Sequence, residues 1–323
     1  MNGAAAANAQ SLHSRGLAGL WSKVRAHAGH FWTWFMIWTC SRCPWLVPII
    51  RPLILWFAWR CSADTRRITL TNARRLLGES SSQAQRTRLA KSLLLNFTSF
   101  ILEMGRNRRR TLEQMQSDID SIEGLDRYTA ARAQHRGAIL AAAHLGAFEL
   151  AVAGLRGHEP NVHVVFRRDN MPIFESLRQD LHARLGVIEA PIDDAPGSLG
   201  PWLALRDALK RDEVVLLQAD RTLPGQRGVR VPFLSGHLEL PPGPIKLAIA
   251  SGSPIVPVFS FWLPTGKIKI VIEEPIEVTE PWGRESTHPA LLELSRVIEQ
   301  YVKAHPDQWF VFEPALCEDQ EHA

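Results

Sequence analysis

The chain has 323 residues, of which 46% are apolar, and it carries 37 Lys and Arg against 33 Asp and Glu. This composition excludes a disordered tail, a collagen-like fibre and a polytopic membrane protein, and it favours one large domain with or without an appendage. The charge is unevenly spread, because residues 1–136 carry a net charge of +12 and residues 137–323 a net charge of −8. Seven of the eleven tryptophans lie between Trp21 and Trp59. A basic, Trp-rich front end is typical of a segment that meets a membrane surface.

Residues 31–59 form an apolar run that is long enough to cross a bilayer, since about 20 apolar residues suffice. Its interior holds Arg42 and Arg51, each of which costs about 2.5–3.5 kcal/mol at the bilayer centre, and three prolines that interrupt helical hydrogen bonding. We therefore predict a membrane-associated helical hairpin that bends near residues 41–44 and dips into one leaflet. A single tilted span and a buried core hairpin are the alternatives. We assign residues 1–62 to this anchor.

The stretch from residue 60 to residue 110 carries twelve Lys and Arg against three acidic residues. Cations beside a membrane segment mark the cytoplasmic side and attract anionic lipids by about 1 kcal/mol each. The apolar positions follow helical spacing, and the stretch has neither the interleaved aromatic residues nor the motifs of nucleic-acid-binding proteins. We therefore predict basic helices over residues 63–136 that pack onto the following domain, with no nucleic-acid partner. The predicted location is the inner membrane, with the catalytic domain on the cytoplasmic side.

From residue 137 onward, short apolar runs alternate with amphipathic stretches, as in α/β domains. We predict a central mixed sheet flanked by helices over residues 137–318, which forms one domain with residues 63–136, and a tail at residues 319–323. The predicted strands are 138–143, 162–166, 214–218, 255–261 and 268–273. The predicted helices are about 147–156, 172–185, 199–211, 243–251 and 286–304.

One pair of residues in this domain is of the types that are common in catalytic sites. His144 ends an apolar run, and Glu149 follows five residues later where a helical pattern begins. If His144 lies on the strand-to-helix loop and Glu149 in the first helical turn, both side chains can reach one cleft at the carboxyl edge of the sheet. A neutral histidine beside a carboxylate is suited to be a general base. The alternative is structural, with Glu149 favouring the helix dipole and His144 an ordinary loop residue.

This segment resembles the His-x4-Asp/Glu motif of the glycerolipid and glycolipid acyltransferases, and specifically the late lipid A acyltransferase family of the lauroyl/myristoyl type. Further blocks follow in the order of that family, at residues 165–172 (VFRRDNMP), 216–221 (LLQADR) and 231–233 (VPF). The segment 306–309 (PDQW) is similar to the Pro-x-Gln-aromatic element of the family, but the basic ending expected after it is missing. The phosphate acyltransferase branch of the superfamily instead has Asp at the position of Glu149.

The resemblance implies that His144 takes a proton from an acceptor hydroxyl or amine, which attacks an acyl thioester, and that Glu149 orients the imidazole. Arg167 is implied to face a phosphate or the developing oxyanion, for which a permanently charged guanidinium is well suited. The other substrate-binding positions implied are Asn170, Asp220 and Arg168, and a solvated charge is the alternative for the last of these. No metal and no cofactor are implied.

The function implied is that of a membrane-associated acyltransferase. It would move an acyl chain from acyl carrier protein or acyl-CoA to a hydroxyl or amine of a glycolipid or another lipid, without a covalent acyl-enzyme. One alternative is a non-catalytic lipid-binding or assembly protein on the same fold. Another is a thioesterase that uses the same His and Glu, although the Gly-x-Ser-x-Gly elbow of many hydrolases does not occur in the sequence. The residues leave the acceptor, the acyl chain length and the choice of donor open.

Overall fold

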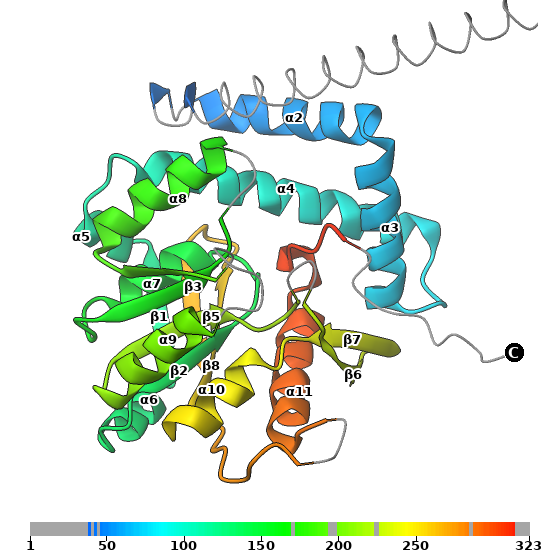
Figure 1. Cartoon of the computed structure of the whole chain (residues 1–323). Helices are drawn as coiled ribbons and strands as arrows, with labels where there is room; N and C mark the ends of the chain where they lie inside the picture. Colours follow the sequence, from blue (N-terminus) through cyan, green and yellow to red (C-terminus); the bar gives the residue numbers. More distant parts are fainter. Residues whose placement is uncertain are drawn as a thin grey trace, which may run out of the picture.

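The computed structural model of the chain describes residues 38–39, 42–43, 46–168, 172–192, 199–222, 226–283 and 287–313. Its centre is a seven-stranded sheet with the strand order β1-β9-β8-β2-β5-β3-β4 (Figure 1). Neighbouring strands are parallel except for β8 and β9, which makes the sheet mixed, as predicted. The strands are β1 (Ile119–Glu123), β2 (Ala138–Ala142), β3 (Val162–Phe166), β4 (Ile188–Pro191), β5 (Val214–Gln218), β8 (Ile255–Trp262) and β9 (Ile268–Ile272).

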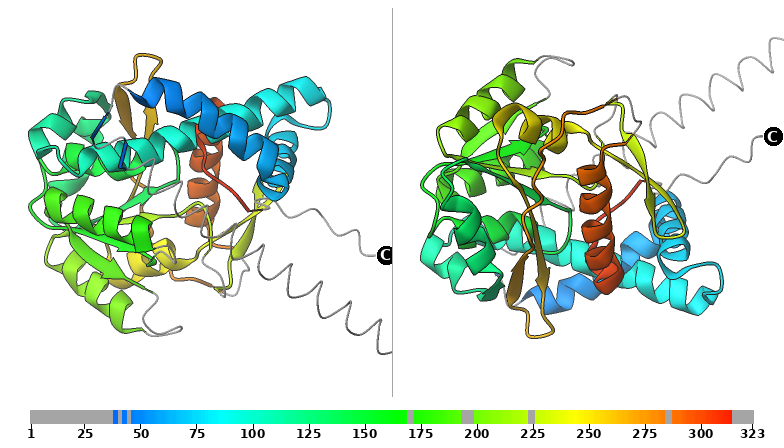
Figure 2. Two further views of the ribbon diagram at one scale, coloured as in Figure 1. Left: turned by 90° about the horizontal axis from the view of Figure 1, so that it is seen from above. Right: turned by 90° about the horizontal axis from the view of Figure 1, so that it is seen from below.

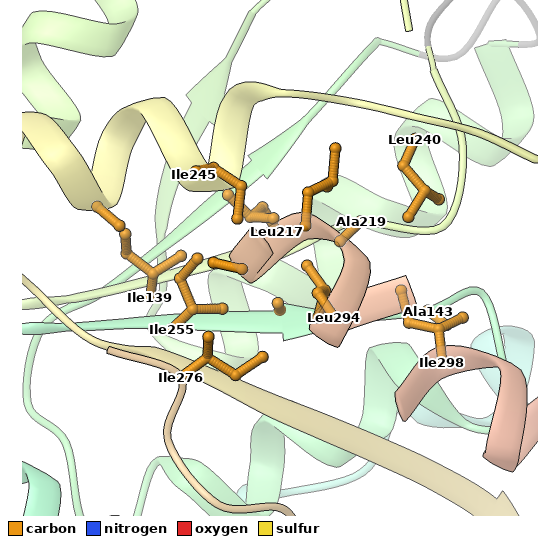
Figure 3. Packing of buried hydrophobic residues seen from close by; sticks show 14 of the residues in the cluster. Ile139, Ala143, Leu217, Ala219, Leu240, Ile245, Ile255, Ile276, Leu294 and Ile298 are labelled. Atoms are coloured by element: carbon orange, nitrogen blue, oxygen red, sulfur yellow. The ribbon is translucent and has the colours of Figure 1, made fainter. Parts of the chain in front are cut away.

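Helices cover both faces of this sheet, because successive residues of the central strands are buried against different helices. Ile139 and Ala141 of β2 lie in one buried cluster with side chains of α9, α10 and α11, and Ala138 and Leu140 lie in a second with side chains of α5 to α8. Figure 3 shows part of the first cluster. The helices are α5 (Leu112–Gln116), α6 (Leu125–Arg132), α7 (Phe148–Leu155), α8 (Pro172–Leu185), α9 (Gly200–Lys210), α10 (Gly243–Ser251) and α11 (Pro289–Ala304).

The predicted strands and helices after residue 137 are confirmed, with ends that differ by at most three residues. Three further parts were not predicted: the edge strands β1 and β4, and a hairpin of β6 (Val229–Phe233) with β7 (Gly236–Leu240). Both edge strands are partly exposed and hold polar residues, so they lack the continuous apolar run that identifies a buried strand. We expected only helices over residues 63–136, but β1 also lies within this segment.

In the described part of the chain, α5 and the sheet are preceded by α2 (Val47–Cys61), α3 (Ala63–Leu77) and α4 (Gln83–Asn107). Helix α4 packs against α2, α3, α8 and the short helix η2 (Pro306–Gln308). Figures 1 and 2 show α2 lying obliquely across α4 at one end of the molecule. Among the described helices, none combines the length and the apolar content needed to cross a bilayer.

Helix α2 contains two of the three prolines and ends at neither of them, although Pro52, inside the helix, has no N–H to donate. Pro48 lies in the first turn of α2, where backbone N–H groups have no helical partner, and the helix continues through Pro52. Pro44 and most of the predicted first arm of the hairpin lie outside the described residues. Arg51 of α2 faces α4, where its guanidinium donates to the Leu95 carbonyl at 3.4 Å.

Candidate active site

The candidate site forms where two adjacent parallel strands end. Ala142 of β2 pairs with Gln218 of β5, and two residues further along each chain the side chains of His144 and Asp220 meet. The distance from His144 Nδ1 to Asp220 Oδ1 is 2.7 Å, and the backbone N–H of His144 donates to Asp220 Oδ2 at 3.1 Å. The sheet register therefore produces a His-Asp pair from residues 76 positions apart in sequence.

Asp220 is completely buried, and each of its carboxylate oxygens accepts a hydrogen bond. The indole Nε1 of Trp309 donates to Oδ2 at 2.8 Å. Burial opposes ionisation, but His144, Arg221 and the indole outweigh it and hold the pKa of Asp220 well below its ordinary value. An ionised carboxylate at Nδ1 requires a proton on that nitrogen. It therefore leaves Nε2 of His144 as the nitrogen able to accept a proton.

Arg221 lies against the same imidazole. Its Nε is 3.1 Å from His144 Nδ1, and one terminal nitrogen donates to the Phe310 carbonyl at 3.1 Å. Because Nδ1 carries the proton that Asp220 accepts, Arg221 acts here as a neighbouring charge and not as a hydrogen-bond donor to the ring. Arg221 is the last residue of the block at residues 216–221, and the structure places it half-buried in the site.

The loop that carries His144 pairs with the C-terminal part of the chain. The backbone N–H of Gly146 donates to the Gln308 carbonyl, and the N–H of Phe310 donates to the His144 carbonyl, each at 2.9 Å. Gly146 has φ +58°, and a Cβ atom there would lie 2.5 Å from the carbonyl oxygen of Ser260. Glycine is therefore required for the close approach of this loop to β8.

The C-terminal segment is in turn held by the basic helices. Asn72 of α3 donates to the Val311 carbonyl at 3.0 Å, and Asn96 of α4 donates to the backbone and the carboxylate of Asp307. Trp309 lies between these two anchoring points and is 2% exposed. The front helices thus fix the residue whose indole completes the hydrogen bonding of Asp220.

Glu149 lies in the first turn of α7, as predicted, but its hydrogen bond is to a different histidine. Its Oε2 is 3.3 Å from Nε2 of His182 on α8. Burial by itself would raise the pKa of Glu149. The hydrogen bond and the charge of His182 outweigh burial, and the charges of Arg178 and His144 add smaller contributions, so the pKa lies below its ordinary value. The orienting contact that we expected Glu149 to make with the imidazole of His144 is made by Asp220.

The predicted arginines lie at the end of β3. Arg167 and Arg168 directly follow that strand and are both exposed, so they are accessible to a ligand. Asn170 lies outside the described residues. The structure therefore brings Asp220 to His144 and leaves Arg167 and Arg168 at the neighbouring strand end.

Aromatic side chains separate His144 from α4. The ring of Phe148 meets the imidazole edge-on, with centroids 5.3 Å apart, and Phe100 of α4 stacks on Phe148 at 4.8 Å. Phe148 also lines an apolar cavity between α7 and the sheet. Further lining residues are Leu140 and Ala142 of β2, Leu216 of β5, Val258 of β8, and Ala151 and Leu155 of α7. An apolar space thus begins one aromatic ring away from the candidate base.

The sequence pattern of the bacterial lipid A biosynthesis acyltransferases matches residues 23–316. The chain belongs to this family. Phosphatidylinositol mannoside acyltransferases from two strains of Mycobacterium tuberculosis are 29% identical over 212 residues, which is 61% of this chain and 60% of those proteins. The chain thus spans about 60% of the length of these curated relatives. The crystal structure of the 1-acyl-sn-glycerophosphate acyltransferase PlsC from Thermotoga maritima matches 85% of this chain and 98% of that chain, with 12% identity and a TM-score of 0.36.

Proposed function

We propose that this protein transfers an acyl chain from an acyl thioester to a hydroxyl or amine of a lipid, with His144 as the general base. The observation that carries the proposal is the hydrogen bond of buried Asp220 to Nδ1 of His144, which directs Nε2 to accept a proton. Membership of the lipid A biosynthesis acyltransferase family supports the reaction class.

In the proposed reaction, Nε2 of His144 takes the proton of the acceptor while the acceptor atom bonds to the thioester carbonyl carbon. The carbon–sulfur bond then breaks, and the departing thiolate takes the proton from the imidazolium and leaves as a free thiol. Asp220 stabilises the imidazolium through its hydrogen bond, and Glu149 stabilises it through its charge. We assign Arg167, Arg168 and Asn170 to the anionic groups of the substrates.

We propose that the acyl chain occupies the apolar cavity beside Phe148. Filling this cavity by Ala151→Leu should shift the preference towards shorter chains, because leucine adds three carbons to its lining. We expect the rate with a 16-carbon donor, relative to an 8-carbon donor, to fall about ten-fold. Assays with purified protein and both donors measure this ratio. The 8-carbon rate is the internal control, and an unchanged ratio would place the acyl chain elsewhere.

We also propose that the protein binds the cytoplasmic face of the inner membrane through α2. This helix exposes one apolar stripe, formed by Ile49, Leu53, Trp56 and Phe57, while its other face packs on α4. Exposed cations such as Arg60 lie at its end and favour an anionic lipid surface. The spacing of the stripe, together with the Trp and Phe side chains, is typical of a helix that lies in the membrane interface.

The double substitution Leu53→Asp and Trp56→Asp should weaken binding to anionic lipid vesicles by a factor of at least about 100, since two large side chains lose about 1.5–3 kcal/mol each on leaving the bilayer. Vesicle sedimentation measures the bound fraction. The matched control is Leu199→Asp with Leu292→Asp, which alters two exposed leucines outside the front helices and should bind as the wild type does. Equal loss in both pairs would exclude α2 as the docking element.

For the acceptor, we propose a glycolipid, because the family and the mycobacterial relatives are both named for acylation of glycolipids. Acyl carrier protein and acyl-CoA are the proposed donors. The test uses the purified full chain with each acyl thioester, with and without a membrane glycolipid fraction, and follows free thiol and acylated lipid. We expect thiol release only when acceptor is present. Release without acceptor would identify a hydrolase, and no release with any pair would favour a lipid-binding protein.

A further inference from the structure

A second group of charged side chains begins at Glu149, the residue after Phe148, whose ring meets the imidazole of His144. We call it the Glu149 cluster, and its members are Glu149, Glu175, Arg178, His182 and Glu189. His182 of α8 lies at its centre and is 1% exposed. Its Nε2 is 3.3 Å from Glu149 of α7, and its Nδ1 is 2.9 Å from Glu189 of β4. One buried imidazole thus connects three elements at the edge of the sheet where His144 lies.

The surroundings of His182 favour its protonated form. Both ring nitrogens face a carboxylate oxygen, and a carboxylate accepts a hydrogen bond only from a nitrogen that carries a proton. Arg178 opposes this charge, because one of its terminal nitrogens is 3.3 Å from His182 Nδ1, but it also pairs with Glu189 at 2.7 Å and Glu175 at 2.5 Å. Burial lowers the pKa of His182, whereas Glu149 and Glu189 together raise it above its ordinary value.

We propose that His182 is a positioning residue of the acyl-transfer reaction, which acts by holding the ionised Glu149 carboxylate beside His144. This inference rests on the proposed function. A mostly buried carboxylate without a hydrogen-bond donor would take up a proton or turn towards solvent. In either case its charge would no longer stabilise the imidazolium that forms on His144.

The contacts of Phe166 show that His182 is itself rigidly held. The central carbon of the Arg178 guanidinium lies 3.4 Å from the centroid of the Phe166 ring. The Phe166 and His182 rings meet in a T-shaped contact with centroids 5.9 Å apart. Phe166 is the last residue of β3, so the cluster is fixed to a fourth element of the sheet edge. A histidine held in this way can fix the carboxylate that it binds.

Two amide substitutions separate the two contacts of His182. The side-chain amide of Gln reaches about as far as Nε2, and that of Asn about as far as Nδ1. His182→Gln therefore keeps a donor for Glu149 and loses the one for Glu189, while His182→Asn does the reverse. We expect kcat to fall about ten-fold in His182→Asn and to stay within about three-fold of wild type in His182→Gln, with KM for the acyl donor unchanged in both.

A double-mutant cycle with Glu149→Gln tests whether His182 acts through Glu149. We expect His182→Asn to lower kcat by no more than about two-fold when Glu149 is already replaced, because the residue that it positions is gone. A merely structural role would give the same loss in both backgrounds. His163→Asn is the matched control, because it removes another largely buried His-carboxylate pair, with Glu213 at 2.7 Å, and should leave kcat unchanged.

Thermal unfolding of each variant shows whether the fold is intact. If His182→Asn does not fold, His182→Gln still tests the proposal. A folded His182→Gln protein with a ten-fold loss of kcat would overturn it. Wild-type kcat in folded His182→Asn would also overturn it. Failure of the proposed function is distinguishable, because in that case the wild-type protein itself transfers no acyl chain to any acceptor tested.

Discussion

Replacement of His144 by alanine should reduce acyl transfer about a thousand-fold, with the fold and the binding to membranes retained. The expected loss is large because Nε2 of His144 is the proposed acceptor of the proton, and removal of a general base costs about 10²–10⁴-fold. His144 lies on a loop, and its side chain is 25% exposed, so its removal leaves only a small gap. Steady-state acyl transfer with the preferred thioester measures the loss.

His163→Ala provides a matched comparison for this experiment. His163 of β3 also pairs with a carboxylate, Glu213, but it lies near the amino end of its strand, away from the candidate site. We expect the rate of this variant to stay close to that of the wild type. If His144→Ala kept most of the activity, the general-base assignment and the proposed function would both be wrong.

Asp220→Asn should lower kcat about 10³-fold and change KM little. The amide has one oxygen and one NH2 group, so it cannot accept from both His144 and Trp309, as the carboxylate does. An amide nitrogen directed at Nδ1 would favour the tautomer with its proton on Nε2, which cannot act as a base.

Trp309→Phe keeps the carboxylate of Asp220 and removes only the indole donor. We expect a smaller loss of about ten-fold there, and an equal loss in both variants would contradict the dominant role of Asp220.

Asp220→Asn also tests whether Asp220 is ionised in the folded protein. Its pKa is lowered by folding, so its contribution to the free energy of unfolding is present above the ordinary Asp pKa of about 3.9 and is lost as the pH falls towards the folded pKa. The difference in unfolding free energy between wild type and Asp220→Asn should therefore shrink below about pH 4. Urea unfolding from pH 7 to pH 3 measures it. A constant difference would mean that the buried carboxyl is already protonated.

The local parts of the site could be predicted from the sequence. His144 follows an apolar strand and Glu149 begins an amphipathic helix, and such a strand-to-helix junction is encoded within a dozen residues. Asp220 was recognised only through a family motif, and its contact with His144 depends on β5 lying next to β2. His182 gave no signal, because a histidine among the charges of an amphipathic helix is ordinary until its burial is known.

The basic front of the chain was likewise predictable only in part. The sequence indicated a basic, Trp-rich segment, but it did not show which cations face solvent. In the structure Arg106 and Arg110 both pair with Asp118, and Arg108 pairs with Asp180 at 2.7 Å. Part of the positive charge is therefore used within the protein, and the exposed apolar stripe of α2 is the more direct support for the docking surface that we propose.

The sequence by itself determined the α/β class, most elements after residue 137 and the position of the candidate base, because these depend on local patterns of apolar and polar residues. Only the tertiary structure decided which carboxylate meets that base. Asp220 comes from 76 residues away and Trp309 from a further 89, and the order of strands in the sheet and the path of the C-terminal segment bring them together. Such partners are set by packing between distant segments, which the spacing of residues along the chain does not encode.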